Sequence, residues 1–435
     1  MNFETRKRLY ARCRDEPLTP EDDRNVDFDH QGGLAVRGIS WVDRLAAPIL
    51  LEDRPTHQLV TGLPGSGKST ELKRLEAHLR GPLEKPGFLV ARIDAEDAFD
   101  LTQPIDLPDL IAVLVDAAER VVLEAEGAPP DAAETGFLGR LWRWLTETEA
   151  ELQKIQIDGG PSKLTFEMKS RPAFRQQVRA SLAKHFTRFL KEAHQELELL
   201  DARARAMGWQ SLCLILDQLE KLRGLGSNWA EVQESAERVF GSGAPYLKLP
   251  VHCLFTVPPA LVNLRNLDVE FMPMVKLRDR DNVRFEAGYA AIREVVRRRI
   301  PDPELEQLLG EAFEKRLETL IDRSGGYLRE IVLALRWLLE LPRLPASDAD
   351  LERLHNEGRE RFRSLVTDED IPWLARVAVE KTLPLPSEDD RPMVDRAIQN
   401  HIVLRYLNND IWFGLHPAVL DIRRVQDAIA ELKKT

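Results

Sequence analysis

A glycine-rich segment between an apolar run and a helical repeat constrains the fold of this chain most strongly. The run His57–Thr61 is typical of a short β-strand, and Glu71 to Leu79 carries apolar residues at helical spacing. Between them, residues 62–69 read Gly-Leu-Pro-Gly-Ser-Gly-Lys-Ser and fit the pattern G-x-x-x-x-G-K-[ST]. In this pattern backbone N–H groups surround phosphates, and the following helix presents its positive end. The segment therefore predicts a strand, phosphate loop and helix of an α/β protein.

The loop supplies the first group of candidate site residues. We expect the ammonium of Lys68 to reach the β- and γ-phosphate oxygens of ATP, and the hydroxyl of Ser69 to ligate Mg²⁺. The alternative is a loop that keeps the pattern but has lost its ligand. The predicted nucleotide-binding residues of the loop are Gly62, Pro64, Gly65, Ser66, Gly67, Lys68, Ser69 and Thr70.

The acidic partner of such a loop follows a second apolar run. The pentapeptide Leu-Cys-Leu-Ile-Leu precedes Asp217, whose carboxylate can hold Mg²⁺ through water. Glu220 stands three residues further on, where a carboxylate can orient and deprotonate an attacking water. The competing interpretation pairs Glu220 with Lys221 or Arg223 on a solvated turn, because Gln218 and not an acid follows Asp217.

Two further candidates stand at the ends of predicted elements. Thr256 follows an apolar run, where it either helps to place the water or only ends the strand. Arg329 follows Ser-Gly-Gly-Tyr-Leu early on a predicted helix, from which a guanidinium can reach the phosphates and report the nucleotide state. The alternative for Arg329 is a surface arginine paired with Glu330.

Further apolar runs indicate the rest of the sheet. They cover residues 88–93, 211–216, 251–255 and, as a fifth strand, 272–277. Near-continuous apolar runs of this kind suit a parallel sheet that is buried on both faces. The predicted fold is an α/β sandwich of the P-loop type around that sheet, followed by a helical lid and a C-terminal winged-helix-like domain.

The 435 residues predict about two to four domains. We divide the chain into a lead-in without clear periodicity (1–55), a core (56–280), a helical lid (281–365) and a winged-helix-like domain (366–435), whose wing is a hairpin around Asn408 and Asn409. A helical arm is inserted at about 131–207. The insertion follows a helix at 107–126, and it contains helices at 137–154 and 172–207 and a hairpin of strands 155–157 and 164–168.

These motifs together resemble the AAA+ and STAND-like branch of the P-loop ATPases, which includes origin-recognition initiators and ATPases of bacterial conflict systems. The resemblance covers about residues 56 to 435. It implies an ATPase that switches conformation or oligomerises. Gln218 stands where AAA+ proteins usually have an acid, which indicates slow hydrolysis, and the arm lies outside the common core, which suggests a specific partner surface.

The resemblance also implies an arginine finger supplied by a neighbouring subunit. Its position in the family falls between the fourth and fifth strands, where Arg265 is the arginine present, and the cluster Arg297-Arg298-Arg299 is the competing candidate. Three arginines on one helix are more typical of a solvated face.

Charge and cysteine content exclude several classes of function. The net charge of −11 argues against a surface that is a nucleic-acid or membrane footprint throughout. Residues 367–435 hold 9 lysines and arginines against 12 aspartates and glutamates, so packing or partner docking is favoured there over DNA binding. Three cysteines, Cys13, Cys213 and Cys253, form no disulfide or zinc pattern, and no signal or membrane-spanning segment is visible. We expect a cytoplasmic protein.

The sequence thus predicts an ATP-binding, slowly hydrolysing switch that uses Mg²⁺. In this interpretation Lys68 and Ser69 hold the phosphates and metal, Glu220 activates water, and Arg329 couples phosphate loss to the lid. We expect a homo-oligomer in the ATP state and an effector or sensor protein as partner, with antiviral defence as one setting. The alternatives are a DNA-binding regulator of initiator or transposition type, and a scaffold that binds nucleotide without turning it over.

Overall fold

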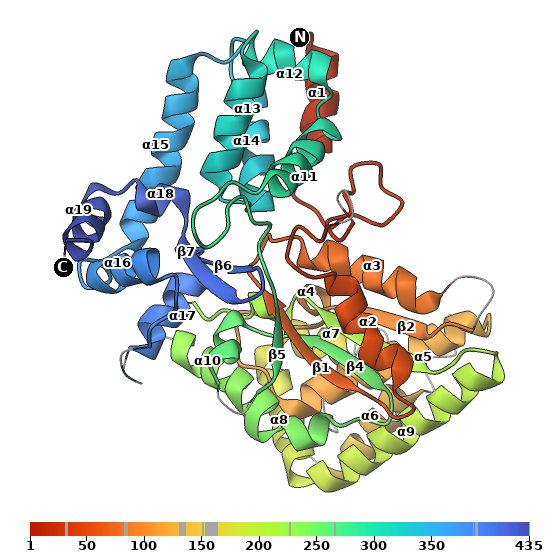
Figure 1. Cartoon of the computed structure of the whole chain (residues 1–435). Coiled ribbons are helices and arrows are strands. Elements are labelled where there is room, and N and C mark those ends of the chain that lie inside the picture. Colours follow the sequence, from red (N-terminus) through yellow and green to blue (C-terminus); the bar gives the residue numbers. More distant parts are fainter. Residues whose placement is uncertain are drawn as a thin grey trace. The chain divides into compact units, whose positions relative to one another are not determined.

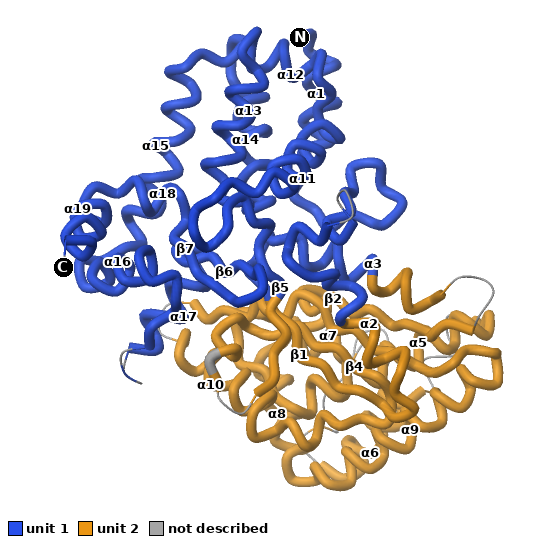
Figure 2. Tube along the Cα trace, viewed as in Figure 1, with its two compact units in different colours: residues 1–44, 62–74, 272–435 blue, residues 45–61, 75–271 orange. Residues whose placement is uncertain are grey.

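The computed structural model describes residues 1–30, 34–81, 86–129, 136–149, 152, 164–225, 228–264, 267–385, 387 and 390–434. These residues form two compact units, shown in Figure 2. Unit 1 comprises residues 1–44, 62–74 and 272–435, and unit 2 comprises residues 45–61 and 75–271. Each unit has a hydrophobic core of its own.

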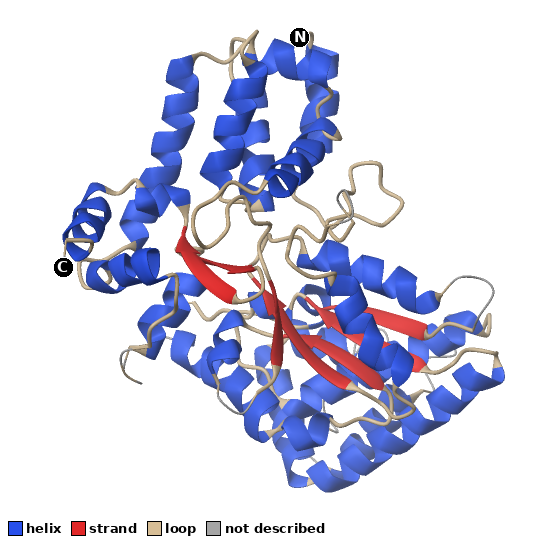
Figure 3. Cartoon of the chain, in the orientation of Figure 1, coloured by secondary structure: helices blue, strands red, loops and turns tan. Residues whose placement is uncertain are grey.

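Five strands form one sheet in the order β2-β3-β4-β1-β5. Figure 3 shows the strands in red. Adjacent strands of the run β2-β3-β4-β1 are parallel, and every residue of β3 and β4 is buried. Because these strands are parallel, the carboxyl ends of β1, β3 and β4 lie at the same edge of the sheet. The strands are β1 (His57–Gly62), β2 (Leu89–Asp94), β3 (Leu212–Asp217), β4 (His252–Thr256) and β5 (Val269–Met272).

Four of the five predicted strands are confirmed, and the fifth is displaced. We predicted it at residues 272–277, whereas β5 ends at Met272. The apolar residues that follow have a different role, since Val275 and Leu277 are buried in the core of unit 1. An apolar run marks burial, and burial alone does not distinguish a strand from an extended connection.

The helices of unit 2 pack into one core with the sheet. Four helices contribute buried residues to this core: α5 (Leu107–Ala125), α6 (Phe137–Thr148), α8 (Pro172–Lys184) and α9 (Phe186–Ala206). Helix α9 packs along α5 (Figure 1). The predicted arm is therefore part of the core of unit 2. The shorter helices there are α4 (Ala95–Ala98), η3 (Leu219–Lys221), α10 (Trp229–Glu237), η5 (Arg238–Ser242), η6 (Ala244–Leu247) and η7 (Pro259–Asn263).

Two details of the predicted insertion are wrong. The segment 164–168, predicted as the second strand of a hairpin, belongs to helix α7 (Leu164–Ser170), where Leu164 and Met168 are buried one turn apart. The first strand of that hairpin, residues 155–157, lies outside the described residues. The predicted helix 172–207 is divided at His185, whose backbone leaves the helical conformation (φ −121°, ψ 24°).

Unit 1 contains the predicted helical lid. Its helices are α11 (Glu286–Arg297), α12 (Asp302–Leu309), α13 (Phe313–Ser324), α14 (Leu328–Glu340) and α15 (Asp348–Leu365). The breaks between these helices contain proline or glycine, and α15 begins with a capping box of Ser347 and Asp350. The apolar faces of α11 to α14 form most of the core of unit 1.

The lead-in contains two helices that its sequence pattern did not predict. Helix α1 (Phe3–Arg12) is capped by Asn2, which accepts from the backbone N–H of Thr5, and it packs on α14. There the guanidinium of Arg336 lies 4.4 Å from the centre of the Tyr10 ring. A second helix, α2, spans Trp41–Leu51. Leu9 is the buried residue of α1, and most of the other residues of this helix are charged or polar, so the sequence pattern is weak.

The C-terminal region of unit 1 contains the predicted hairpin. Strands β6 (Val403–Leu407) and β7 (Ile411–Leu415) pair antiparallel, with Tyr406 stacked on Trp412. The surrounding helices are α16 (Ile371–Glu380), α17 (Arg391–Gln399), α18 (Pro417–Leu420) and α19 (Arg423–Leu432). The winged-helix assignment stays a prediction. Among the described residues, no helix is both long and apolar enough to cross a membrane.

Candidate functional site

The phosphate loop follows β1 and begins α3 (Lys68–Arg80). Gly65 and Gly67 have φ angles of 82° and 97°, in the left-handed region that favours glycine. The hydroxyl oxygen of Ser66 is buried and has no hydrogen-bond partner among the described residues, and Lys68 is buried as well. A loop with left-handed glycines, a buried unpartnered hydroxyl and a lysine is suited to an anion with several oxygens. The residues therefore fit the predicted phosphates.

Three residues of unit 1 bind the carbonyl groups of this loop, and we call them the loop clamp. Tyr327 donates its hydroxyl to the carbonyl of Pro64 at 2.7 Å, and the Nε2 of His401 lies 2.9 Å from the same oxygen. The two rings are stacked with centroids 4.7 Å apart. The backbone N–H of Arg329 donates to the carbonyl of Gly65 at 3.3 Å. Burial raises the pKa of Tyr327 to about 12 and lowers that of His401 to about 4, so both groups are neutral near pH 7.

The clamp leaves no room for a side chain on the loop. A Cβ atom at Gly65 would lie 2.8 Å from the Tyr327 hydroxyl and 2.8 Å from the Cβ of Arg329. Real Cβ atoms avoid such distances, so Gly65 is required by both its φ angle and this close approach. The glycine pattern thus serves the lid contact as well as the predicted phosphate site.

A buried arginine, Arg37, also binds the phosphate loop. Arg37 is 1% exposed and donates to the carbonyl of Ser66 at 2.9 Å and to that of Pro273 at 2.7 Å. Its guanidinium also lies 4.0 Å from the carboxylate of Glu71, on the first turn of α3. Sequence reasoning missed Arg37 because it follows a stretch without periodicity.

The side chain of Arg329 contacts the N-terminal segment. Its Nε lies 2.6 Å from the carboxylate of Asp15, and both side chains are about a third exposed. Glu330, the alternative partner predicted for Arg329, is paired with Arg361 at 3.0 Å. The surface pairing of Arg329 with Glu330 is therefore wrong, and Asp15 is a site residue that the sequence did not reveal.

Thr70 also contacts the N-terminal segment. Its hydroxyl oxygen accepts from the backbone N–H of Leu18 at 3.1 Å. One turn along the same helix, Lys73 donates to the carbonyl of Pro17 at 2.8 Å. Residues 15–18 therefore lie beside the start of α3 and beside Arg329.

Unit 2 contains the predicted acidic residues Asp217 and Glu220. They lie in the turn of residues 217–221 at the end of β3, which we call the acid turn. Asp217 is fully buried, and its Oδ1 accepts from the backbone N–H of Gln218 at 2.7 Å. Its Oδ2 lies 3.6 Å from a guanidinium nitrogen of Arg92. Gln218 has a left-handed backbone (φ 68°), and its amide group contacts Asp94 and Lys221. Gln218 is thus engaged in fixing the turn.

Glu220 lies inside this turn and is 3% exposed. The two cations proposed as its surface partners are engaged elsewhere, since Lys221 pairs with Glu96 at 2.8 Å and Arg223 lies over the ring of Trp229. The interpretation of Glu220 as a carboxylate on a solvated turn is therefore wrong. Its role as a general base stays a prediction.

Thr256 has a contact that the sequence did not predict. It is the last residue of β4, and its hydroxyl oxygen accepts from the backbone N–H of Leu219 at 2.8 Å. Both groups are buried. Thr256 therefore positions the turn that carries Glu220, whereas its contact with a water stays a prediction.

The structure describes one of the two candidates for an arginine finger, the cluster Arg297-Arg298-Arg299. Arg265 lies outside the described residues. In the competing cluster, Arg297 pairs with Asp302 and Arg298 with Glu294, while Arg299 is buried and donates to the carbonyl of Val295. Each arginine of the cluster thus has a partner within the chain, and a finger in trans stays a prediction.

No protein-family model and no curated protein sequence matches the chain. Among solved structures, a Walker-type ATPase of Pyrococcus abyssi is similar at 14% identity and a TM-score of 0.41, covering 96% of this chain and 99% of that one. The ORC2 protein of Aeropyrum pernix, solved as ADPNP–ADP complexes, is similar at 13% identity and a TM-score of 0.40, covering 99% of both chains. The parallel sheet, the glycine loop after β1 and the acid at the end of β3 define an α/β fold of the P-loop type, as predicted.

Proposed function

We propose that the protein is an ATP-binding and slowly hydrolysing switch of the AAA+ or STAND-like type. The observation that carries this proposal is the loop clamp. Residues of the lid and of the C-terminal region converge on two neighbouring carbonyl groups, those of Pro64 and Gly65, inside the loop that fits phosphates. A change of the loop on nucleotide binding would alter these contacts directly.

The residues of the predicted phosphate, metal and water sites have the following roles in this proposal. The loop residues Gly62 to Thr70 and the ammonium of Lys68 bind the phosphates of ATP. Ser69 and Asp217 are the ligands for Mg²⁺, which would neutralise phosphate charge and orient the oxygens. Glu220 accepts a proton from the attacking water, and its burial in the acid turn supports a fixed orientation for that carboxylate.

Arg329 couples the nucleotide to the lid in this account. Its guanidinium is held by Asp15 through an ion pair that is about one-third exposed, and such partly exposed pairs are weak. A terminal phosphate competes with Asp15 for the guanidinium, while the backbone N–H of the same residue remains on Gly65. Loss of that phosphate returns Arg329 to Asp15 and resets the lid.

The output of such a switch is an assembly or a partner. We propose a cytoplasmic homo-oligomer in the ATP state that engages an effector or sensor protein, with bacterial antiviral defence as one setting. The DNA-regulator alternative is disfavoured by the net charge of −11 and by the acidic excess in residues 367–435.

A second candidate is a scaffold that binds nucleotide without hydrolysing it. Two observations favour it. Gln218 occupies the position after Asp217 and is held by its own contacts, and Arg92 lies beside the Asp217 carboxylate, where a cation lowers its attraction for a metal. Turnover decides between the two candidates.

Calorimetry with ATP and Mg²⁺ tests the binding claim. Lys68→Ala should lower ATP affinity by about 10- to 150-fold, which corresponds to the ~1.5–3 kcal/mol of a hydrogen bond to a charged group. Lys73→Ala is the matched control, because it removes a lysine of the same helix that bonds the carbonyl of Pro17. An unchanged affinity in Lys68→Ala would show that the loop does not hold ATP.

Phosphate release and light scattering on the same samples test the switch itself. We expect turnover above the Lys68→Ala background and a larger mass with ATP than with ADP. ATP binding without any turnover would favour the scaffold.

A further inference from the structure

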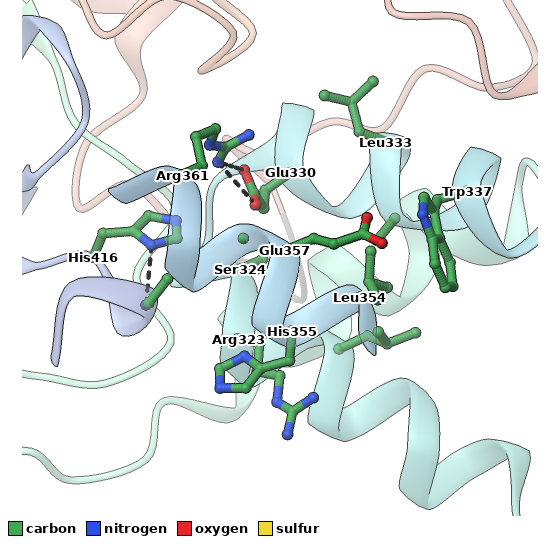
Figure 4. A pocket seen from close by; sticks show the side chains of 14 residues that line it. Arg323, Ser324, Glu330, Leu333, Trp337, Leu354, His355, Glu357, Arg361 and His416 are labelled. Atoms are coloured by element: carbon green, nitrogen blue, oxygen red, sulfur yellow. Dashed lines mark hydrogen bonds and ion pairs between the residues drawn. The ribbon is translucent and has the colours of Figure 1, made fainter. Parts of the chain in front are cut away.

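Each unit has a cavity that none of the roles above uses. The cavity of unit 1, about 220 Å³, lies among α13, α14, α15 and α18 (Figure 4). There the carboxylate of Glu330 accepts two hydrogen bonds from Arg361, at 3.0 and 3.2 Å, as the dashed lines show. The cavity of unit 2, about 510 Å³, is lined by residues of α3, α4, α5, α7 and β2. Its ion pairs are arranged differently, because one guanidinium lies between two carboxylates.

This shared guanidinium belongs to Arg92 on β2. Its Nε donates to the carboxylate of Glu76 on α3 at 3.1 Å. Its Nη1 lies 3.6 Å from the Oδ2 of Asp217. The first distance is that of a hydrogen bond, whereas the second exceeds the usual limit of about 3.2 Å and is an ion pair alone. Arg92 is therefore bonded to Glu76 and close to Asp217.

Asp217 is the carboxylate that the proposed function assigns to Mg²⁺. It is fully buried, and its Oδ1 accepts from the backbone N–H of Gln218, whereas its Oδ2 faces Arg92. A guanidinium and a metal ion compete for one carboxylate, because both are attracted to it and they repel each other. A buried carboxylate without a cation destabilises the fold, so Arg92 suits the chain when no metal is bound.

The cavity offers Arg92 a second position. Its side chain is 24% exposed and borders the cavity together with Glu76 and Asp97. Glu76 is itself shared, since Arg80 lies 3.0 Å from its other oxygen. A guanidinium that is bonded through Nε keeps its terminal nitrogens as further donors. These nitrogens can therefore exchange Asp217 for a carboxylate of the cavity while the bond to Glu76 is kept.

We propose that Arg92 is a positioning residue that holds the buried carboxylate of Asp217 until a divalent cation replaces it, and that Glu76 then keeps the guanidinium at the cavity. Arg92 thus weakens metal binding at the acid turn, and each metal ion that binds moves a positive charge from the turn toward the cavity. The inference rests on the proposed function, because that function assigns the metal to Asp217.

Manganese alone, without nucleotide, tests this exchange. Mn²⁺ takes the same oxygen ligands as Mg²⁺, and electron paramagnetic resonance counts the free ion. Arg92→Gln should raise the affinity of the full chain for Mn²⁺ at low salt by about 10-fold, the usual effect of one adjacent charge. Arg80→Gln is the matched control, because it removes the same charge and the other arginine of Glu76, and it should change the affinity by less than about 2-fold.

Two further variants separate charge from packing. Arg92→Lys keeps the cation and should restore most of the wild-type affinity for Mn²⁺. Glu76→Gln removes the competing acceptor and leaves Arg92 to Asp217, so it should lower the affinity by about 3- to 5-fold. Glu124→Gln, at an exposed carboxylate of the same cavity, changes the net charge equally and should have no effect. If Arg92→Gln does not fold, the comparison of Glu76→Gln with Glu124→Gln decides.

Equal Mn²⁺ affinity of Arg92→Gln and wild type would overturn the exchange, and so would an equal rise in Arg80→Gln. Asp217→Asn added to Arg92→Gln should remove the gained affinity. If the gain persists in this double variant, the metal does not bind at Asp217, and the metal assignment of the proposed function fails together with the exchange. The gain should also be found in a Lys68→Ala background, so a failure of ATP binding would leave the exchange standing.

Discussion

The phosphate loop and the acid turn are held by contacts of very different range. The carbonyl of Pro64 is bound by Tyr327 and His401, 263 and 337 positions away. The acid turn is fixed by residues at the ends of neighbouring strands, with Leu219 bonded to Thr256 on β4 and Gln218 to Asp94 on β2. The loop is therefore held by the lid and the C-terminal region of unit 1, whereas the acid turn is held by the sheet of unit 2. In the proposed switch, the loop would transmit a change to the lid and the acid turn would stay in place.

Removal of the acid in the turn should give the largest effect. Glu220→Gln should keep ATP bound and lower turnover by roughly 10² to 10⁴, because a buried amide cannot accept the proton from water. Phosphate release measures this. Glu96→Gln is the control, since it removes an exposed carboxylate that pairs with Lys221 and should leave turnover unchanged. If Glu220→Gln hydrolyses ATP as fast as wild type, the base is another residue.

Loss of the strand contact tests whether the turn is fixed by the sheet. Thr256→Val leaves the buried N–H of Leu219 without its acceptor and should lower the free energy of unfolding by about 1–3 kcal/mol. Urea unfolding monitored by circular dichroism measures this. Thr256→Ser retains the hydroxyl and should keep most of the stability. A valine variant as stable as wild type would show that the hydrogen bond does not support the turn.

The loop clamp should respond to acid. Burial holds the pKa of His401 at about 4 against an ordinary value of about 6.5, so the unfolded chain binds the extra proton first as the pH falls. The contribution of His401 to stability is complete above pH 6.5 and is lost between pH 6.5 and 4, by at most about 1.4 kcal/mol per pH unit.

Asparagine at this position tests the acid response, because it tolerates the left-handed backbone of His401 (φ 61°) and does not titrate. Unfolding of His401→Asn should show a shallower pH dependence than wild type below pH 6.5. His30→Asn, at an exposed histidine, serves as the control. An unchanged slope in His401→Asn would assign the acid response to other groups.

The weakest expected effect concerns Arg329. Asp15→Asn releases the guanidinium from a partly exposed ion pair worth about 0.2–1 kcal/mol, so ATP affinity should rise by up to about 5-fold. Affinity for ADP should not change, because ADP lacks the competing phosphate. Asp23→Asn, which breaks the exposed pair with Arg12, controls for the loss of a surface charge. Equal gains for ATP and ADP would separate Arg329 from the terminal phosphate.

The sequence predicted the parts of the fold whose patterns are local. Four strands, the lid helices and the C-terminal hairpin follow from apolar periodicity and turn residues, and the structure confirms them. Helix α1 of the lead-in was not predicted, because it buries one apolar residue, Leu9, and it packs on α14, which is distant in sequence. The strand predicted at residues 164–168 was wrong, because apolar and polar residues that alternate over five positions also fit one helical turn.

The residues of the candidate site likewise fall into those that belong to a local sequence motif and those that do not. The motif residues Lys68, Asp217 and Glu220 could be predicted, because a phosphate loop and its acids have fixed spacing around strands. Arg37 and Asp15 could not be predicted, since their roles arise from contacts across the folded unit and carry no local pattern. The buried state of Glu220 was also beyond the sequence, because it depends on packing around the turn.

Hydrogen–deuterium exchange with and without ATP and Mg²⁺ tests the central claim most directly. The account predicts that ATP changes exchange in the loop (62–70) and also in the clamp segments 325–331 and 401–407, with no change in Lys68→Ala. Protection of the loop by ATP while both clamp segments exchange as before would contradict it, because nucleotide would then bind without reaching the lid.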